Sequence, residues 1–135
     1  MNKGKIVQVL GPVVDVVFEH NNLPSIKDAL EVDNAGTRCV MEVAQHIGND
    51  TVRCIMLASS EGLYRGMEVT ATGSGIKVPV GDATLGRLFN VLGDAIDGGD
   101  PLSDSPKWEI HRDPPDFEDQ RPVVEILETG IKVID

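Results

Sequence analysis

The segment spanning residues 5–18, KIVQVLGPVVDVVF, changes the parity of its apolar positions part-way along its length. Before Gly11-Pro12 the apolar positions are odd, at Val7 and Val9, and after it they are even, at Val14, Val16 and Phe18. Side chains alternate between the two faces of a strand, so one extra residue moves all later side chains to the opposite face. We therefore interpret this segment as one long strand with a bulge at Gly11-Pro12, bent as a small closed barrel requires.

Further short strands are predicted up to residue 80, at residues 29–32, 38–47, 51–57, 67–70 and 76–80. Residues 38–47 alternate most clearly, because Cys39, Met41 and Val43 share one face while Glu42 and His46 share the other. A tight turn at residues 48–50 predicts a hairpin with residues 51–57, whose inward side chains are Val52, Cys54 and Met56. Strands of this length, separated by glycine-rich turns, predict an all-β barrel of about six strands.

The chain has 135 residues, 41% of them hydrophobic, which is enough for a domain with a buried core. Its net charge of −10 divides into −2 for residues 1–80 and −8 for residues 81–135, which predicts a boundary near residue 80. An acidic chain lacks the basic surface of a nucleic-acid-binding protein. No apolar run approaches the ~18 residues that span a bilayer. The N-terminus has no secretory signal pattern, so we expect a cytosolic protein.

The segment after residue 80 is expected to start with a helix that ends near Leu92. Asp82 or Thr84 would cap it, and Gly93 would end it. Its apolar stripe would consist of Leu85, Leu88, Phe89 and Leu92. Turns are expected from residue 94 to 106, followed by a mixed segment at 117–135 with Val123, Ile126 and Leu127 as its apolar residues. We expect this acidic segment to pack against something that the chain does not contain. The sequence ends inside its last expected element, so the chain looks cut.

No residue can be assigned to catalysis, cofactor binding or metal binding from its chemistry. Asp94, Asp97, Asp100 and Asp104 crowd one loop, but their spacing does not match a calcium loop, so we interpret them as turn residues. His20, His46 and His111 have no accompanying nucleophile motif, and His46 is expected at the surface. Glu42 is placed to pair with Arg53 across the predicted hairpin. Neither a P-loop nor a G-x-G-x-x-G dinucleotide fingerprint occurs in the sequence.

The two cysteines, Cys39 and Cys54, are expected to be buried, reduced thiols. In the predicted hairpin Cys54 lies opposite about Ala44, and Cys39 lies opposite about Ser59, so they are not partners. Neither belongs to a C-x-x-C pair, which makes a zinc site improbable.

Several long segments together resemble the beginning of the beta subunit of the F-type ATP synthase. They are GKIVQVLGPVVDVVF at 4–18, MEVAQHIGNDTVR at 41–53, EGLYRGMEV at 61–69, VPVGDATLGRLFNVLGDAID at 78–97 and FEDQRPVVEILETGIKVID at 117–135. The alpha subunit shares the VPVG and LGR…LG…ID pattern, whereas GPVVDV, MEVAQH and ETGIKVID resemble the catalytic beta type. Flagellar-export and vacuolar-type ATPases are more distant fits.

The resemblance implies a six-stranded N-terminal β-barrel at residues 1–77, used in assembly, and the incomplete start of a RecA-like α/β nucleotide-binding domain at residues 78–135. It implies a parent enzyme that makes ATP from ADP and phosphate with a transmembrane proton gradient. The nucleotide-binding P-loop and the catalytic glutamate of the family would lie after Asp135, so this chain alone is expected to be inactive. The parent's ATP, ADP and Mg²⁺ therefore have no assigned ligand here.

The implied partners are the alpha subunits of a hetero-hexamer and, through the parent, the gamma subunit and the membrane sector. No contact with nucleic acid and no membrane insertion are expected. The implied location is the cytoplasmic face of the cell membrane, and the lack of a transit segment favours a bacterial source. Two alternatives stay open. The first, beside the favoured beta-subunit fragment, is a free-standing barrel that binds alpha-type subunits. The second is an oligonucleotide-binding barrel, which the charge of the chain and its scarcity of aromatic residues disfavour.

Overall fold

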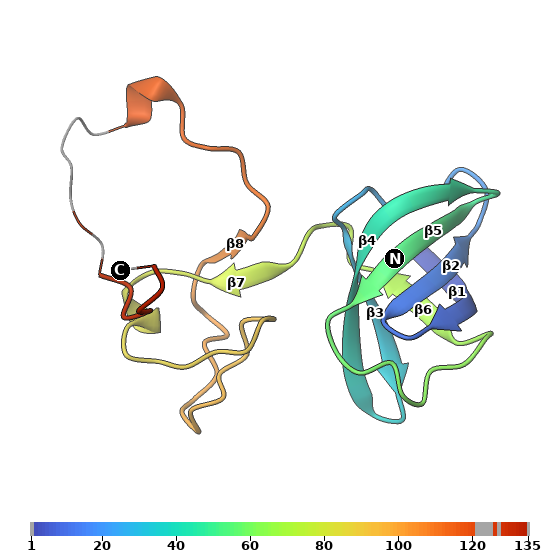
Figure 1. The fold of residues 1–135 in the computed structure, drawn as a ribbon, viewed down its shortest axis with the longest axis horizontal. Coiled ribbons are helices and arrows are strands. Elements are labelled where there is room, and N and C mark those ends of the chain that lie inside the picture. Colours follow the sequence, from blue (N-terminus) through green and yellow to red (C-terminus); the bar gives the residue numbers. More distant parts are fainter. Residues whose placement is uncertain (1, 121–125, 127, 135) are drawn as a thin grey trace.

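The computed structural model describes residues 2–120, 126 and 128–134 of the chain. Six antiparallel strands close into a barrel in the order β1-β2-β5-β4-β3-β6. Figure 1 shows this barrel as a distinct unit, with the residues after it in a more open arrangement of turns. The barrel strands are β1 (Asn2–Leu10), β2 (Val13–Phe18), β3 (Ala29–Asn34), β4 (Thr37–Gly48), β5 (Thr51–Met56) and β6 (Glu68–Ala71). The prediction of a mainly β protein with a six-stranded barrel is confirmed.

The first segment is a hairpin of two strands, so its interpretation as one long strand is wrong. β1 and β2 pair antiparallel, with Leu10 opposite Val13, and Gly11 turns between them with φ of +57°. The irregularity that shifts the apolar parity lies between Ile6 and Gln8, well before the turn. Ile6 therefore supplies the buried apolar side chain of β1 ahead of the shift, whereas Val7 is only partly buried. The parity change in the sequence was real, but a bulge and a turn both contribute to it.

The hairpin of β4 and β5 confirms the alternation that the sequence predicts. Cys39, Met41 and Val43 of β4 are buried, as are Val52, Cys54 and Met56 of β5. A register shift between Val43 and Gln45 places Cys54 opposite Val43, one residue from the predicted partner Ala44. The turn between the strands has Asn49 and Asp50 at positive φ, a conformation that these two residue types tolerate well.

The main core fills the barrel with small and medium apolar side chains. Its fully buried members include Ile6, Val14, Val16, Leu30, Met41, Val43, Val52, Cys54 and Val69. A second, smaller cluster joins Ala29 and Val40, on the β3–β4 pair, to Ile76 and the partly buried Leu92. The second cluster attaches the residues after the barrel to its outer surface.

The predicted amphipathic helix ending at Leu92 is wrong. The structure has only a 3-10 turn, η1 (Asp82–Thr84), followed by turns in which Gly86 and Gly93 take positive φ. A short helix needs tertiary packing of its apolar face, and Leu85 and Leu88 remain 75% and 58% exposed. The loop is organised instead by local hydrogen bonds, since Oδ1 of Asn90 accepts bonds from the backbone N–H groups of Leu92 and Asp94.

The last extended piece predicted from the sequence, residues 76–80, lies outside the barrel. It contains β7 (Lys77–Pro79), which pairs antiparallel with β8 (Lys107–Glu109) in a separate two-stranded sheet. A further 3-10 turn, η2, covers Phe117–Asp119. Of the apolar residues predicted for the last segment, Val123 and Leu127 lie outside the described residues. In the described part of the chain, no helix is long and apolar enough to cross a membrane.

Candidate interaction surfaces of the barrel

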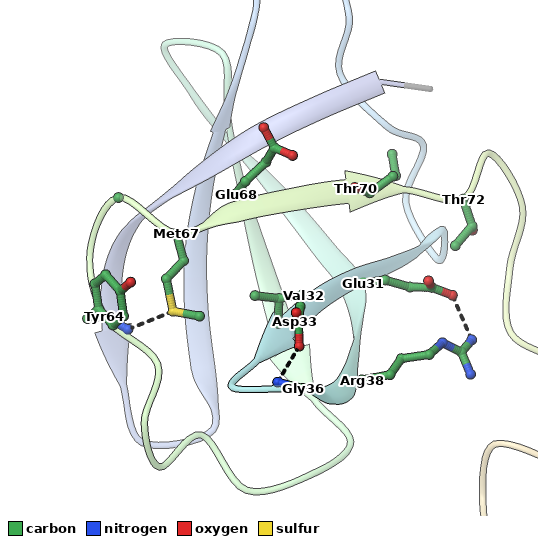
Figure 2. A pocket seen from close by; sticks show the side chains of 12 residues that line it. Glu31, Val32, Asp33, Gly36, Arg38, Tyr64, Met67, Glu68, Thr70 and Thr72 are labelled. Carbon is green, nitrogen blue, oxygen red and sulfur yellow. Dashed lines mark hydrogen bonds and ion pairs between the residues drawn. The ribbon is translucent and has the colours of Figure 1, made fainter.

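A groove of about 960 Å³ lies on the outer surface of the barrel beside β3 and β6. Figure 2 shows Tyr64, Met67 and Glu68 on one side of it and Asp33, Gly36 and Arg38 on the other. We call it the β3–β6 groove. The residues lining it are Glu31, Val32, Asp33, Gly36, Arg38, Tyr64, Gly66, Met67, Glu68, Thr70, Ala71 and Thr72.

The groove forms because β3 and β6 separate before β3 ends. Their ladder runs from the pair Leu30–Ala71 to the pair Val32–Val69 and extends no further. Beyond it the turn at residues 62–67 leans toward β1, where the N–H of Ile6 donates to the carbonyl of Met67 at 3.0 Å. β3 meanwhile continues into its own turn with β4, in which the N–H of Gly36 donates to Oδ1 of Asp33. The diverging strands leave an open space between the two turns.

The groove combines an apolar wall with a charged rim. Tyr64 is 66% exposed, and its backbone N–H donates to Sδ of Met67 at 3.3 Å. On the rim, Nη2 of Arg38 donates to the Glu31 carboxylate at 2.6 Å, and this hydrogen bond raises the pKa of the guanidinium. At the other side, Glu68 accepts a hydrogen bond from Lys3 at 2.6 Å. With Glu31, Asp33 and Glu68, carboxylates outnumber the single lining cation, Arg38.

A row of apolar side chains crosses the other side of the barrel. The register aligns Leu10 of β1 with Val13 of β2 and Val13 with Ile55 of β5. All three point outward, because Val14 of β2 and both Cys54 and Met56 of β5 point into the core. Leu10 is 57% exposed and Ile55 is 48% exposed. We call this row the β1–β2–β5 ridge.

Beside the ridge lies an ion pair that the sequence analysis missed. Asp15, only 4% exposed, accepts two hydrogen bonds from Arg53, from Nε to Oδ1 and from Nη2 to Oδ2, each of 2.8 Å. The bonds from Arg53 lower the pKa of Asp15, although burial acts in the opposite direction. The two residues face one another in the β2–β5 ladder. The lone Asp15 within an apolar strand was the signal in the sequence for a buried charged group. The sequence does not identify its partner, because that depends on which strands are neighbours in the barrel.

The predicted pairing of Glu42 with Arg53 is wrong, since Arg53 is bound to Asp15. Instead, Oε2 of Glu42 lies 2.9 Å from Nε2 of His111, and this contact links β4 to the segment after β8. His46 is exposed, as predicted, and its Nε2 lies 2.8 Å from the carbonyl oxygen of Pro24. His20 contacts Asp50 at the far hairpin turn. The structure therefore does not bring the three histidines together.

The aspartates of the acidic loop have structural partners. The Asp97 carboxylate binds Arg87 and also accepts bonds from the backbone N–H groups of Gly99 and Leu88. The Arg87 hydrogen bond, followed by that of Gly99, holds the pKa of Asp97 well below its usual range. Asp94 accepts a bond from Nδ2 of Asn90. Within the described ranges, no three His, Cys, Asp or Glu side chains are grouped to hold a metal ion.

The two thiols, Cys39 and Cys54, are free and buried in the barrel core. Burial, reinforced by the nearby charge of Asp15, raises the pKa of Cys54 to about 12. A thiol of that kind is a weak nucleophile near neutral pH, so Cys54 serves as a small apolar core residue.

Residues 6–73 match the family model described as the ATP synthase alpha/beta family, beta-barrel domain. The chain belongs to the ATP synthase alpha/beta family. The matched residues run from within β1 to just beyond β6, so they include nearly the whole barrel together with the β3–β6 groove and the β1–β2–β5 ridge. This ATP synthase-type barrel thus has two exposed surfaces of different character.

Proposed function

We propose that the chain is the N-terminal part of the catalytic beta subunit of a proton-translocating, F-type ATP synthase. The family match supports an alpha/beta-type barrel, and the segments GPVVDV, MEVAQH and ETGIKVID favour the beta type over the alpha type. In this proposal the complete subunit makes ATP from ADP and phosphate with the energy of a transmembrane proton gradient.

The role proposed for the barrel is to hold neighbouring subunits together in the hexamer. The observation that carries this role is the closed barrel, whose strands all have two partners in the sheet while apolar and charged side chains are exposed on its outside. A closed sheet has no long free edge and resists deformation, so it is suited to a fixed rim above domains that open and close. The alpha subunits would contact it on both sides, and the gamma subunit and membrane sector would act through the rest of the parent.

The residues of this chain do not fit a Mg-ATP site. Binding of the phosphates by a P-loop needs a G-x-x-x-x-G-K-[ST] segment, which the sequence lacks. The described residues also offer no grouped metal ligands. In this proposal the nucleotide and Mg²⁺ sites belong to the RecA-like domain of the parent subunit, which residues 78–135 would begin. The complex would lie at the cytoplasmic face of the membrane, with neither membrane insertion nor nucleic-acid contact by this chain.

The proposal is tested by mixing the 135-residue chain with a purified alpha-type subunit and measuring complex formation by sedimentation velocity. We expect a complex with the alpha-type subunit and no heat of binding when Mg-ATP is titrated into the chain by calorimetry. A chain that leaves the alpha-type subunit unbound at high micromolar concentration contradicts the assembly role. Tight binding of Mg-ATP to the chain contradicts the location of the nucleotide site.

A further inference from the structure

Asp97 and Gly98 form the only Asp-Gly dipeptide of the sequence, which contains no Asn-Gly dipeptide. Among aspartyl residues, those followed by glycine isomerise most readily, because glycine has no side chain to hinder the approach of its own amide nitrogen. Gly98 lies in the acidic loop at residues 94–106, at φ of +77°, a conformation that glycine adopts without strain. The loop therefore contains a reactive dipeptide that the proposed assembly role does not use.

Isomerisation needs a neutral aspartyl carboxyl group that is free to turn. The backbone nitrogen of Gly98 attacks Cγ of Asp97 and loses its proton, and one carboxyl oxygen leaves as water, so that a five-membered succinimide forms. Water then adds to one of the two ring carbonyls next to the nitrogen and opens the ring. Opening at Cγ restores aspartate, whereas opening at the backbone carbonyl gives isoaspartate. The water lost in the first step is returned in the second, so no co-reactant is consumed.

In the folded chain both oxygens of the Asp97 carboxylate are occupied. Oδ2 accepts hydrogen bonds from Nε of Arg87 at 2.5 Å and from the backbone N–H of Leu88 at 3.2 Å. Oδ1 accepts bonds from Nη2 of Arg87 and from the backbone N–H of Gly99, each at 3.0 Å. Arg87, followed by Gly99, lowers the pKa of Asp97, so the neutral carboxyl group that the reaction needs is rare. The paired, two-point contact with Arg87 also restrains rotation of the carboxylate.

The Arg87 guanidinium is held in place by the loop on the far side of Gly98. Its Nη2 also donates to the carbonyl oxygen of Asp100 at 2.9 Å. A Cβ atom added at Gly99 would lie 2.5 Å from the same Nη2, so the loop backbone packs directly against the guanidinium. The side chains of Arg87 and Asp97 are 21% and 22% exposed, which limits the access of water to the pair. Arg87 therefore fixes the chain on both sides of the reactive peptide bond.

We propose that Asp97–Gly98 is a latent isoaspartate site, which the Arg87–Asp97 ion pair protects while the loop is folded. When the ion pair opens, the carboxylate is free to take up a proton and to turn toward the nitrogen of Gly98. In isoaspartate the chain continues through the former side chain, and the carboxylate that remains is one carbon shorter. That carboxylate cannot keep all the bonds to Arg87, Leu88 and Gly99, so the modified loop does not close again.

The inference is tested by incubating the whole chain near neutral pH in water enriched in ¹⁸O and analysing its peptides by liquid chromatography and mass spectrometry. Each passage through the succinimide leaves one ¹⁸O atom at position 97, and isoaspartate separates from aspartate by retention time. Arg87→Gln removes the guanidinium, and Arg87→Lys keeps the charge without the two-point contact. Lys77→Gln is the matched control, because Lys77 pairs with Glu109 in the β7–β8 sheet. Circular dichroism checks that each barrel is folded, and each chain is also incubated in concentrated guanidinium chloride.

We expect ¹⁸O uptake at position 97 of the native wild type to be slower than in denaturant by on the order of tenfold, because the reaction then requires local opening. Native Arg87→Gln should take up the label about fivefold faster than the native wild type, with Arg87→Lys between them and Lys77→Gln unchanged. All four chains should react equally fast in denaturant. The inference is overturned if native Arg87→Gln reacts no faster than the wild type, or if its acceleration persists in denaturant. Neither result bears on the proposed assembly function.

Discussion

Replacement of Gly4 by alanine tests how closely β1 approaches β2. A Cβ atom at position 4 would lie 2.8 Å from Cγ1 of Val16, 2.8 Å from the carbonyl oxygen of Val17 and 3.0 Å from Cε1 of Phe18. Val16 is fully buried and the Val17 oxygen belongs to the backbone of the paired strand, so neither can withdraw without moving β2. The added methyl group must therefore push the first hairpin apart.

The expected magnitude follows from two opposing effects. Forcing an additional methyl group into a packed core costs about 1–3 kcal/mol. Alanine also lowers the conformational entropy of the unfolded chain, which stabilises the folded state by about 0.4–1 kcal/mol. We expect Gly4→Ala to lower the free energy of unfolding by about 1–2 kcal/mol, and the midpoint of thermal unfolding by roughly 4–8 °C per kcal/mol for a domain of this size.

The measurement is urea unfolding followed by circular dichroism, with thermal melting as a second probe. Gly75→Ala is the control. The atom nearest to its added Cβ would be the carbonyl oxygen of Lys27, at 3.4 Å, which is an ordinary van der Waals distance. That variant should remain within about 0.5 kcal/mol of the wild type, as surface substitutions usually do. A Gly4→Ala protein as stable as the wild type would refute the close approach of the two strands.

Three further outcomes are expected. Substitution of Asp15 by asparagine should lower the free energy of unfolding at neutral pH. Because the pKa of Asp15 is depressed in the folded state, the stability advantage of the wild type is present above about pH 4 and shrinks as the pH falls below that value. Urea titrations at several pH values measure this difference, and a difference that stays constant with pH would contradict the prediction. The Cys54 thiol, with its pKa of about 12, should resist alkylation by iodoacetamide at pH 8 until denaturant unfolds the barrel. Mass spectrometry measures the alkylation, and rapid reaction of the native protein would count against the burial of Cys54. Arg87→Gln removes the main partner of Asp97, whose carboxylate accepts bonds from the Leu88 and Gly99 amides. Hydrogen exchange at these two amides should therefore become several-fold faster, while the barrel amides stay protected. Unchanged exchange would show that the ion pair does not hold the loop.

The barrel strands were predictable because their side-chain alternation is local and strong. The inward sets of β4 and β5, and the turn between these strands, follow from a period of two and a loop of turn-forming residues. The first hairpin was misjudged for a physical reason. A bulge near Val7 and a turn at Gly11 both change the parity, and the sequence alone cannot separate one event from two.

The predicted helix failed for the opposite reason, since its spacing was suitable but its packing partner is missing from the described structure. Leu92 reaches the barrel cluster of Ala29, Val40 and Ile76, whereas Leu85 and Leu88 remain exposed. A short helix without a buried face gains too little to form, so backbone turns and the Arg87–Asp97 pair organise the loop instead.

By itself, the sequence determined the fold class, the inward face of most strands and the resemblance to the ATP synthase alpha/beta family, because these depend on local periodicity and on runs of consecutive residues. Only the tertiary structure decided that Asp15 binds Arg53, that Glu42 meets His111, and that a groove and a ridge lie on different sides of the barrel. Each of these features joins residues far apart in the chain. They depend on strand order and register, which the closure of the barrel sets and which no local pattern of side chains encodes.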